Sequence, residues 1–572
     1  MSNKWASLGG SPTPSAPTSF SPQQRERLAY KPTLPAVLAS GSCSLSHGQV
    51  LKPENDSERL KQLFPSTFGL PTAHFTTEVN GNAAQGISYK SATPLRVGCV
   101  LSGGQAPGGH NVISGLFDSL KAIHPDSVLF GFLDGPRGLF KGNFYEITPE
   151  LMNGYRNMGG FDIIGSGRDK IETPEQFAGA KEVAQRLDLD GVIIIGGDDS
   201  NTNAAVLAEQ FEQSKLRTRV IGCPKTIDGD LKITGQMDIS FGFDTACKTY
   251  SELIGNVCLD ALSSGKYYHF IRLMGRAASN ITLECALLTQ PNITLIGEEV
   301  AARNQNLSSV TEEIVHVILE REKQGKNYGV VLVPEGLIEF VPEMNVLLHE
   351  INELLASGTA ATVEAVADEL SANSAALFHY LPASIRKQLL ADRDPHGNVQ
   401  VSLIETEKLL AETVQHELHR LHKQGKYKSH FSPQFHFYGY EGRCGLPSDF
   451  DTEYCYALGY NAAALVRFQQ TGLMSAVLNL DAPVSSWTCG GLPITALMNL
   501  ERRHGKDKPV IKKALVELKS LPFKTFAANR EAWAIGDKYR CCGPIQLGHY
   551  GDRVDLCKTL SLELQEQKEK GK

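Results

Sequence analysis

The fold class follows from one stretch, Gly191-Val192-Ile193-Ile194-Ile195-Gly196-Gly197-Asp198-Asp199-Ser200. Its first five residues form a short apolar run rich in β-branched side chains, which predicts a strand buried on both faces of a parallel sheet. Glycines and two carboxylates come next, at the point where such a strand turns toward a helix. Ligands bind at the carboxyl ends of strands in an open α/β sheet. The stretch therefore predicts an α/β protein with a binding site at this strand end.

A second strand end of the same kind follows. Residues 219–222 are typical of the next buried strand, and Pro224-Lys225-Thr226-Ile227-Asp228-Gly229-Asp230 comes after it. The carboxylates of the two stretches would repel one another unless a cation lay among them. Carboxylates at such a place can bind Mg²⁺ or take a proton from a hydroxyl group. The pattern indicates a phosphoryl-transfer site, and the alternative is that both stretches are loops that cap helices.

Strands and helices alternate on both sides of these stretches. The first block of expected elements has strands at 96–101, 128–132, 191–195 and 219–222 and helices at 111–123 and 174–187. The second block has expected strands at 268–273, 293–296 and 328–333 and helices at 278–288 and 310–323. Such alternation is the pattern of βαβ units. The sequence thus predicts an α/β fold with two Rossmann-like parallel-sheet blocks.

The remaining segments have a different composition. Residues 1–40 are rich in Ser, Pro and Gly, so we expect the first dozen or more to be mobile. Residues 343–430 have a polar, helical texture, with apolar residues at helical spacing over 404–421, which predicts a helical insertion. The charged end, 563–572, is expected to be solvated.

Composition excludes several classes of function. The 572 residues are 41% hydrophobic and 21% charged, which is ordinary for a globular protein. A net charge of -7 argues against a nucleic-acid partner. No apolar run reaches the length of a membrane span, and the first residues lack the order of a secretory signal, so we expect no membrane partner and a cytoplasmic location. The twelve cysteines form no CxxC pair, which favours neither a zinc site nor a disulfide framework.

A glycine-rich turn lies earlier in the chain. The expected strand 96–101 runs into Ser102-Gly103-Gly104-Gln105-Ala106-Pro107-Gly108-Gly109-His110-Asn111 and then into a helix. Glycines let backbone N–H groups approach an anion closely. The spacing fits neither a P-loop nor a dinucleotide-binding motif. Taken alone, the turn is equally consistent with a tight strand-to-helix connection.

Taken together and in this order, the motifs of the chain resemble those of the phosphofructokinases. The residues that carry the resemblance are Gly103-Gly104 with Pro107-Gly108, Gly197-Asp198-Asp199-Ser200, Pro224-Lys225-Thr226-Ile227-Asp228-Gly229-Asp230, Met274-Gly275-Arg276 and Gly543-Pro544-Ile545-Gln546. It covers about residues 95–547, and the N-terminal extension and helical insertion are similar to those of the diphosphate-dependent branch. The resemblance implies the phosphofructokinase fold and reversible phosphorylation of D-fructose 6-phosphate to D-fructose 1,6-bisphosphate by inorganic diphosphate.

The resemblance also implies roles on the side of the phosphoryl donor. Asp228 is expected to take the proton of the sugar hydroxyl, Asp198 to bind Mg²⁺, and Gly103 to hold the donor. ATP-using members typically have Gly at the positions of Asp199 and Lys225. Here Asp199 would exclude a nucleotide, and Lys225 would stabilise the charge of the leaving group. The alternative is that Asp199 and Lys225 form an ion pair at the surface.

Further residues are implied in binding the sugar phosphate. They are Thr226, Ile227, Asp228, Met274, Gly275, Arg276, Glu335, Tyr440, Glu441, Gly442 and Arg443. Tyr440 and Arg443 are expected to reach the 6-phosphate, and Arg276 is expected to open a helix at a strand end. Asp230 would shape the site or serve as a turn residue. By resemblance, Lys266 and Tyr267 reach into the site of a neighbouring subunit, which implies a homodimer or higher homo-oligomer with shared active sites.

The resemblance completes the expected domain organisation. It comprises an N-terminal extension (1–94), a domain that binds diphosphate and Mg²⁺ (95–262), a sugar-phosphate domain (263–342 and 431–560) and the helical insertion (343–430). The C-terminal part of the sugar-phosphate domain is allowed to return to the first domain. Three alternatives stay open: an ATP-dependent phosphofructokinase, a non-catalytic regulatory subunit and a sugar-phosphate-binding sensor. The presence of both Asp198 and Asp228 speaks against a subunit that has lost catalysis.

Overall fold

The computed structural model describes residues 4–41, 43–77, 88–356, 363–391, 393, 399–503, 506–548 and 551–571. The chain divides into two compact units, each made of several segments. The first unit comprises Met1–Ala246, Gly442–Ala514 and Ile545–Leu556, and the second comprises Cys247–Glu441, Leu515–Pro544 and Cys557–Lys572. The first division between them falls within helix α9 (Phe243–Ser264), whereas the sequence placed a boundary at residue 262.

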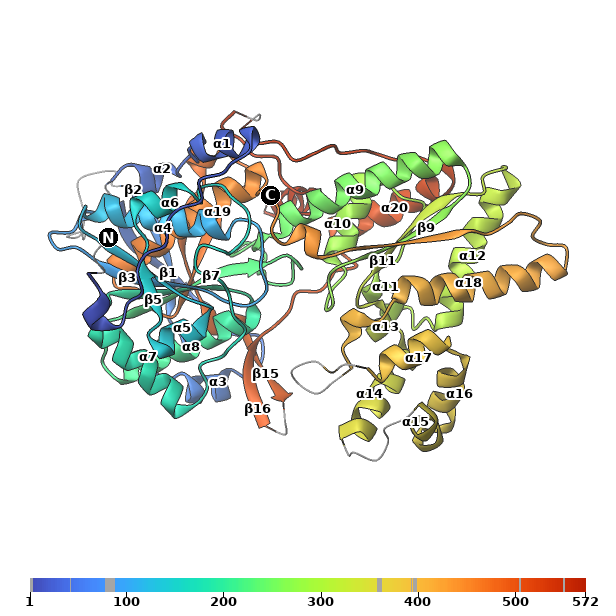
Figure 1. The fold of residues 1–572 in the computed structure, drawn as a ribbon, viewed down its shortest axis with the longest axis horizontal. Helices are drawn as coiled ribbons and strands as arrows, with labels where there is room; N and C mark the ends of the chain where they lie inside the picture. Colours follow the sequence, from blue (N-terminus) through green and yellow to red (C-terminus); the bar gives the residue numbers. More distant parts are fainter. Residues whose placement is uncertain are drawn as a thin grey trace. The chain divides into compact units, whose positions relative to one another are not determined.

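The first unit is built on a ten-stranded sheet, counted over the described residues (Figure 1). Its strand order is β1-β2-β14-β13-β7-β6-β3-β4-β5, and β8 pairs with β7. The strands are β1 (Cys43–Val50), β2 (Pro71–Thr77), β3 (Arg96–Leu101), β4 (Val128–Phe132), β5 (Phe144–Glu146), β6 (Gly191–Gly196), β7 (Arg219–Thr226), β8 (Phe241–Gly242), β13 (Leu473–Leu478) and β14 (Thr488–Pro493). Strands β13, β7, β6, β3 and β4 are parallel, and antiparallel strands extend both edges.

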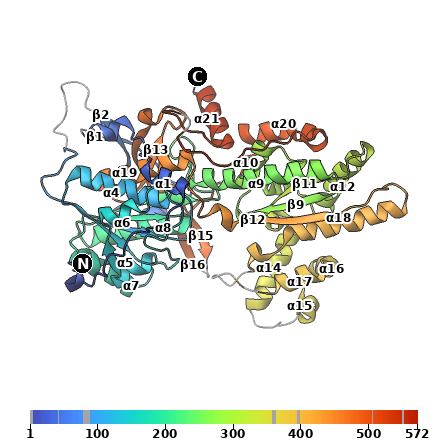
Figure 2. The same ribbon diagram turned by 45° about the horizontal axis from the view of Figure 1, so that its top comes forward.

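Helices cover both faces of this sheet (Figures 1 and 2). On one face, α4 (Gly109–Ile123) packs along α19 (Asp449–Arg467). On the other, α7 (Pro174–Arg186) and α8 (Asp198–Gln213) share one apolar core with alternate side chains of the central strands. All six residues of β6 are buried, as expected for a central parallel strand. The smaller helices of this unit are α1 (Pro22–Ala29), α2 (Ala36–Ala39), α3 (Ser57–Leu63), α5 (Pro136–Lys141) and α6 (Pro149–Asn153).

The N-terminal segment packs against the first unit. The Trp5 ring makes an edge contact with Phe130 at 4.9 Å between centroids, and its indole Nε1 donates to Glu146 at 2.6 Å. Arg27 is buried and donates from Nη1 to the carbonyl oxygen of Pro447 at 2.7 Å. Within the first dozen residues, which the sequence predicts to be mobile, Trp5 thus packs on the sheet of the first unit, and residues 1–3 lie outside the described residues.

The second unit contains a four-stranded sheet, again counted over the described part of the chain, in the order β10-β11-β9-β12. The strands are β9 (Tyr268–Leu273), β10 (Ile293–Thr294), β11 (Gly329–Pro334) and β12 (Pro433–Tyr438). Each adjacent pair is parallel. The predicted α/β fold with two blocks of parallel sheet is therefore confirmed.

Helices surround this smaller sheet and extend beyond it. The helices of the second unit include α10 (Asn280–Thr289), α11 (Gly297–Ala302), α12 (Leu307–Lys323), α13 (Leu337–Phe340), α20 (Leu521–Gly536) and α21 (Lys558–Lys570). The region of the expected insertion forms α14 (Pro342–Ala356), α15 (Val363–Glu369), α16 (Ala372–Tyr380), α17 (Ala383–Leu389) and α18 (Thr406–Lys423). Helices α14 to α17 gather in one group, whereas α18 packs on α12 and β9 (Figure 1).

The C-terminal end corrects another expectation. Residues 563–572 were expected to be a solvated tail, but most of them belong to α21, which packs against α10 and α20. Leu562 and Leu564 are buried there. Because its apolar residues recur at helical spacing, the segment forms a helix with one buried face even though its composition is highly charged.

Two general features accompany the fold. Across the residues that the structure describes, no helix combines the length and the apolar character needed to cross a membrane. All twelve cysteines are free thiols, and most are buried.

Candidate active site

The glycine-rich turn follows β3 in the first unit. Gly103 has a φ of +84°, a left-handed conformation that favours glycine. Its N–H donates to the carbonyl oxygen of Gly167 at 2.9 Å, and its own carbonyl oxygen accepts from Ser166 Oγ at 2.5 Å. On the other side, Ser200 Oγ of α8 donates to Ser102 Oγ at 2.8 Å. The turn is thus held in a fixed conformation from two sides.

Three cationic side chains converge on this turn. Lys225 is only 6% exposed, and its ammonium donates to the carbonyl oxygen of Gly104 at 2.5 Å. A Cβ atom on Gly104 would lie 3.8 Å from Arg443 Cζ and 4.0 Å from Arg168 Nη2. Three cationic side chains therefore lie around one small volume, which is the arrangement of an anion-binding site.

The electrostatics of Lys225 agree with this interpretation. Burial lowers the pKa of its ammonium to about 8. Asp198 and Asp228 oppose this shift, whereas the positive charges of Arg443 and Arg168 add to it. A bound anion would relieve the repulsion among the three cations, so the site favours a negatively charged ligand.

The position of Lys225 differs from the one expected. Strand β7 continues to Thr226, so Pro224, Lys225 and Thr226 lie on the strand and not in a loop after it. The reason is that Pro224 pairs with Gly196 of β6, while Lys225 pairs with Phe241 of β8. Parallel neighbours on both sides keep the backbone extended and bury the lysine.

The carboxylates gather at the ends of β6 and β7, as the sequence predicted. Asp198 is the first residue of α8, where the helix dipole favours a negative charge. The Nζ atom of Lys513 lies 3.6 Å from Asp198 Oδ2 and 3.6 Å from Asp230 Oδ2. Burial, reinforced by Asp228, raises the pKa of Asp230 to about 6, whereas Lys513 opposes the rise.

Thr226 connects the carboxylate of Asp230 to the backbone of Asp228 in the loop that follows β7. Its Oγ1 donates to Asp230 Oδ1 at 3.1 Å and accepts from the N–H of Asp228 at 3.0 Å. Asp230 is 6% exposed, whereas Asp228 is partly exposed. These bonds fix the backbone of the loop, and the Asp228 side chain is partly exposed at its surface.

Asp199 follows Asp198 on the first turn of α8. Its Oδ1 lies 3.2 Å from Lys170 Nζ, and its side chain is 43% exposed. Lys225, in contrast, is buried against Gly104. The alternative of a surface ion pair between Asp199 and Lys225 is therefore wrong, because Lys225 is not at the surface.

Some of the residues implied in sugar binding meet in the second unit at the carboxyl edge of its sheet, whereas Thr226, Ile227, Asp228, Gly442 and Arg443 belong to the first unit. Met274-Gly275-Arg276 follows β9, Glu335 follows β11, and Tyr440 follows β12, which are neighbouring parallel strands. Glu335 Oε2 accepts from the N–H of Gly275 at 3.1 Å. The strand order therefore brings motifs from distant parts of the sequence together.

Further observations at the carboxyl edge of the second sheet concern Gly275, Arg276 and Tyr440. Gly275 has a φ of +125°, so a side chain at this position would strain the backbone. Arg276 is exposed and precedes α10, which starts at Asn280, so it lies in the turn before the helix and does not open it. The N–H of Gly439 donates to Glu441 Oε2 at 2.8 Å, and Tyr440 is 69% exposed.

The remaining implied residues lie as follows. The Tyr440–Arg443 motif is divided, because Tyr440 and Glu441 belong to the second unit, and Gly442 and Arg443 to the first. Lys266 is exposed in the short connection between α9 and β9. Tyr267 is partly buried, and its ring meets His269 edge-on.

The carboxylates of the site differ from a metal site built by the protein alone. Among the described residues, no three His, Cys, Asp or Glu side chains form a cluster that could hold a metal ion unaided. Mg²⁺ usually binds proteins through one or two carboxylates, with substrate phosphates and water as its other ligands. Asp198 is a single carboxylate beside the proposed anion site, and the ammonium of Lys513 already lies near it as a cation. Asp198 therefore fits that type of binding.

The comparisons with known proteins agree with this geometry. Residues 96–466 match the family model described as Phosphofructokinase. The chain belongs to the phosphofructokinase family.

Several members of the phosphofructokinase family are similar over almost their whole length. The chain is 54% identical over 546 residues to pyrophosphate--fructose 6-phosphate 1-phosphotransferase subunit beta of Ricinus communis, covering 95% of this chain and 97% of the relative. It is 49% identical over 548 residues to the pyrophosphate--fructose 6-phosphate 1-phosphotransferase of Porphyromonas gingivalis, covering 94% and 98%. The solved pyrophosphate-dependent phosphofructokinase of Nitrosospira multiformis has a TM-score of 0.53 at 15% identity, covering 82% and 96%. The last comparison supports the phosphofructokinase fold alone.

Three residues of this phosphofructokinase site were not found from the sequence. They are Arg168, Lys170 and Lys513. Arg168 and Lys170 lie in an irregular segment before α7, and Lys513 follows a hairpin distant in sequence from the motifs. No local pattern marks them, since each is placed only by tertiary structure.

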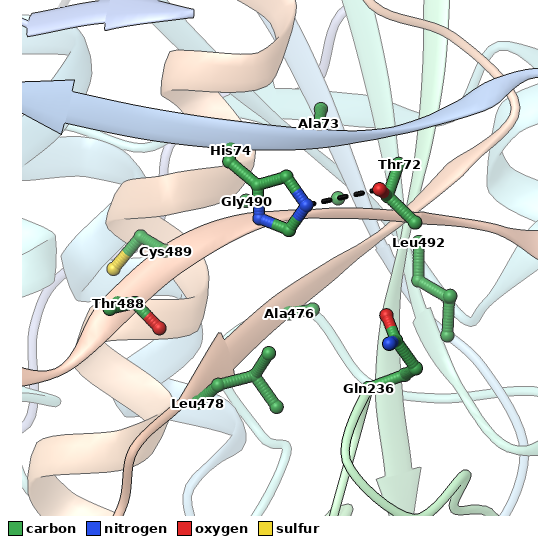
Figure 3. A pocket seen from close by; sticks show the side chains of 11 residues that line it. Thr72, Ala73, His74, Gln236, Ala476, Leu478, Thr488, Cys489, Gly490 and Leu492 are labelled. Carbon is green, nitrogen blue, oxygen red and sulfur yellow. Dashed lines mark hydrogen bonds between the residues drawn. The ribbon is translucent and has the colours of Figure 1, made fainter. Parts of the chain in front are cut away.

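A separate pocket lies between β2, β13 and β14 (Figure 3). His74 points toward Thr72, with 3.0 Å between His74 Nε2 and Thr72 Oγ1. Of the described residues that line this pocket, none belongs to the implied phosphofructokinase site. Its location at the antiparallel edge is therefore distinct from the strand ends that carry the site.

Proposed function

We propose that this chain is a diphosphate-dependent 6-phosphofructokinase. It transfers a phosphoryl group from inorganic diphosphate to D-fructose 6-phosphate, forms D-fructose 1,6-bisphosphate and phosphate, and runs in both directions. The observation that carries the proposal is the convergence of Lys225, Arg168 and Arg443 on the Gly103-Gly104 turn beside Asp198 and Asp228. The names of relatives at 46–54% identity support the same donor and acceptor.

The donor is inorganic diphosphate and not a nucleotide. Lys225 supplies a buried positive charge for the phosphate that leaves, and a charge fixed before reaction stabilises the transition state without reorganisation. The Asp199–Lys170 ion pair supports exclusion of a larger donor, because it adds bulk and a carboxylate on the first turn of α8. The ATP-dependent alternative would leave these residues without a role.

Asp198 is the proposed ligand of Mg²⁺, and the oxygens of diphosphate complete the binding. When bound, the ion neutralises charge on the transferring phosphoryl group. The chain itself orients the donor through the three cationic side chains around the glycine turn, Lys225, Arg168 and Arg443, and holds Asp198 at the start of α8. Asp230 stabilises the loop that carries Asp228 through Thr226.

Asp228 acts as the general base. Its carboxylate accepts the proton of the sugar 1-hydroxyl while that oxygen forms a bond to the terminal phosphorus. The bond between this phosphorus and the bridging oxygen breaks, and inorganic phosphate leaves toward Lys225. In the reverse direction, the protonated Asp228 returns the proton. The fixed loop around Thr226 supports this role because it limits the freedom of the base.

Residues at the carboxyl edge of the second sheet bind the sugar phosphate. We propose that Arg276 and Tyr440 contact its phosphate or hydroxyl oxygens, and that Glu335 accepts from a sugar hydroxyl. Met274, Gly275 and Glu441 shape this edge. In this proposal the first unit binds diphosphate and Mg²⁺, and the second unit binds the sugar phosphate.

The active form is a homodimer or a higher homo-oligomer. Lys266 and Tyr267 are proposed to contact the sugar phosphate of a neighbouring subunit. Lys266 is exposed, and α9, which precedes it, carries exposed Leu259 and Leu262. Apolar side chains that are exposed together are typical of a subunit contact.

The test compares diphosphate with ATP as the phosphoryl donor, and it replaces Asp228, the proposed general base. Wild-type protein should form D-fructose 1,6-bisphosphate with diphosphate and Mg²⁺, and negligible amounts with ATP. Asp228→Asn should reduce turnover with diphosphate by at least about 100-fold, as expected for loss of general-base catalysis. Asp126→Asn, a change of an exposed aspartate in the same unit, is the matched control. Preference for ATP, or normal turnover of Asp228→Asn, would contradict the proposal.

A further inference from the structure

Lys513 occupies an unusual position between two carboxylates of the site. Its ammonium nitrogen lies 3.6 Å from Asp198 Oδ2 and 3.6 Å from Asp230 Oδ2. Asp198 follows β6, and Asp230 follows β7, so the lysine connects the ends of two neighbouring strands. Its side chain is 34% exposed, which leaves it room to move toward solvent.

The backbone around Lys513 is fixed by the same two strand ends. The lysine follows the hairpin of β15 (Met498–Arg503) and β16 (Lys506–Ile511). Before it, the N–H of Ile511 donates to Thr202 Oγ1 of α8 at 3.2 Å. After it, the N–H of Ala514 donates to the carbonyl oxygen of Asp230 at 2.7 Å. The position of the ammonium therefore follows from the fold and not from a chance surface contact.

A lysine ammonium and a metal ion would compete for this place. The ammonium is a compact, movable point charge on a flexible stem. Magnesium needs its oxygen ligands at about 2.0–2.1 Å and keeps several waters when it has few protein ligands. A divalent ion bound at Asp198 would repel an ammonium nitrogen that remained beside the same carboxylate. One cation must move when the other arrives.

We propose that Lys513 holds the cation position between Asp198 and Asp230 in the donor-free protein and yields it to the metal ion that arrives with diphosphate. The inference rests on the proposed function, because it takes Asp198 as the metal ligand. A free metal ion must displace the ammonium without compensation. A metal–diphosphate complex brings phosphate oxygens that can bind the displaced ammonium. Lys513 is thus a positioning residue that favours the metal–diphosphate complex over the metal alone.

The test measures binding of Mn²⁺ alone, in place of Mg²⁺, to the full chain without donor. Free Mn²⁺ is quantified by electron paramagnetic resonance. Lys513→Gln should bind Mn²⁺ at least about tenfold more tightly than wild type, because the competing charge is gone. Lys513→Arg, which keeps the charge, should bind as weakly as wild type. Lys512→Gln is the matched control, since Lys512 pairs with the exposed Glu54 at 2.7 Å.

The outcomes separate this inference from the proposed function. Mn²⁺ binding is measured again with methylenediphosphonate, a diphosphate analogue that is not turned over, and Asp198→Asn should lose most of it. If Asp198→Asn binds Mn²⁺ as well as wild type, the metal assignment is wrong and the inference is wrong with it. If Asp198→Asn loses binding but Lys513→Gln binds Mn²⁺ alone no more tightly than wild type, only the inference is wrong. Equal gains in Lys512→Gln and Lys513→Gln would also overturn it.

Discussion

Replacing Lys225 by methionine should reduce activity without reducing stability. The lysine is buried and donates to the Gly104 carbonyl oxygen. Loss of one hydrogen bond to a charged group costs about 1.5–3 kcal/mol, so kcat/KM for diphosphate should fall by about 10- to 150-fold. The KM for D-fructose 6-phosphate should change much less, because the charge serves the leaving group of the donor.

The stability effect follows from the pKa of the same lysine. Burial lowers that pKa from 10.5 to about 8, which corresponds to about 3 kcal/mol of unfavourable free energy for the charged form in the folded state at neutral pH. Methionine removes this cost but leaves the Gly104 carbonyl without its donor, at about 1–3 kcal/mol. At pH 7 the variant should therefore be as stable as wild type or up to about 2 kcal/mol more stable.

The sign of the pH dependence makes the argument testable. Below pH 8, Lys225 is protonated in the folded and unfolded states. Between pH 8 and 10.5, the unfolded chain keeps a proton that the folded protein has lost, so the stability of wild type rises relative to the variant by about 3 kcal/mol. Denaturant unfolding at pH 7, 8, 9 and 10 measures this difference, with Lys61→Met as an exposed control. A difference that does not change with pH would refute the reasoning.

The remaining predictions concern the donor, the acceptor and the subunits. Because Arg443 lies beside Gly104, Arg443→Ala should raise the KM for diphosphate more than the KM for D-fructose 6-phosphate. A larger rise of the KM for D-fructose 6-phosphate would favour the contact with the 6-phosphate that the resemblance implies. Asp199→Gly should increase ATP use and reduce diphosphate turnover in steady-state assays, and no change with either donor would show that Asp199 does not select it. Mixed oligomers of Lys266→Ala and Asp228→Asn should regain part of the activity if sites are shared, whereas no recovery in verified mixed oligomers would favour sites within one subunit.

The fold and most of the site could be predicted because their signals are local. Strand β3 matches its predicted span of 96–101, and β6 extends one residue beyond its predicted span of 191–195. Both strands contain a continuous apolar run, 97–101 in β3 and 192–195 in β6, and a glycine-containing turn follows each. The carboxylates after β6 and β7 could be placed together because parallel strands end at the same edge of a sheet.

The remaining features depend on contacts between distant residues. The antiparallel edge strands β1, β2 and β14 have no continuous apolar run, and β2 joins the sheet by pairing with β14, which is far away in the sequence. The predicted strand at 219–222 stops short of Lys225, yet Pro224, a residue that is uncommon within a sheet, pairs with β6 and keeps β7 extended to Thr226. Lys513 could not be found, since its role depends on a hairpin that brings it to Asp198.

The packing of the N-terminal segment has a consequence for Arg443. Arg27 holds the carbonyl oxygen of Pro447, and Glu453 accepts from the N–H of Thr33 at 2.6 Å. The first bond holds the stretch between Arg443 and helix α19, and the second joins the N-terminal segment to α19 itself. A protein shortened by its first forty residues should therefore keep every residue of the proposed site and still bind phosphate poorly. We therefore expect the segment to hold the loop that carries Arg443 in place for phosphate binding, although its composition is rich in Ser, Pro and Gly.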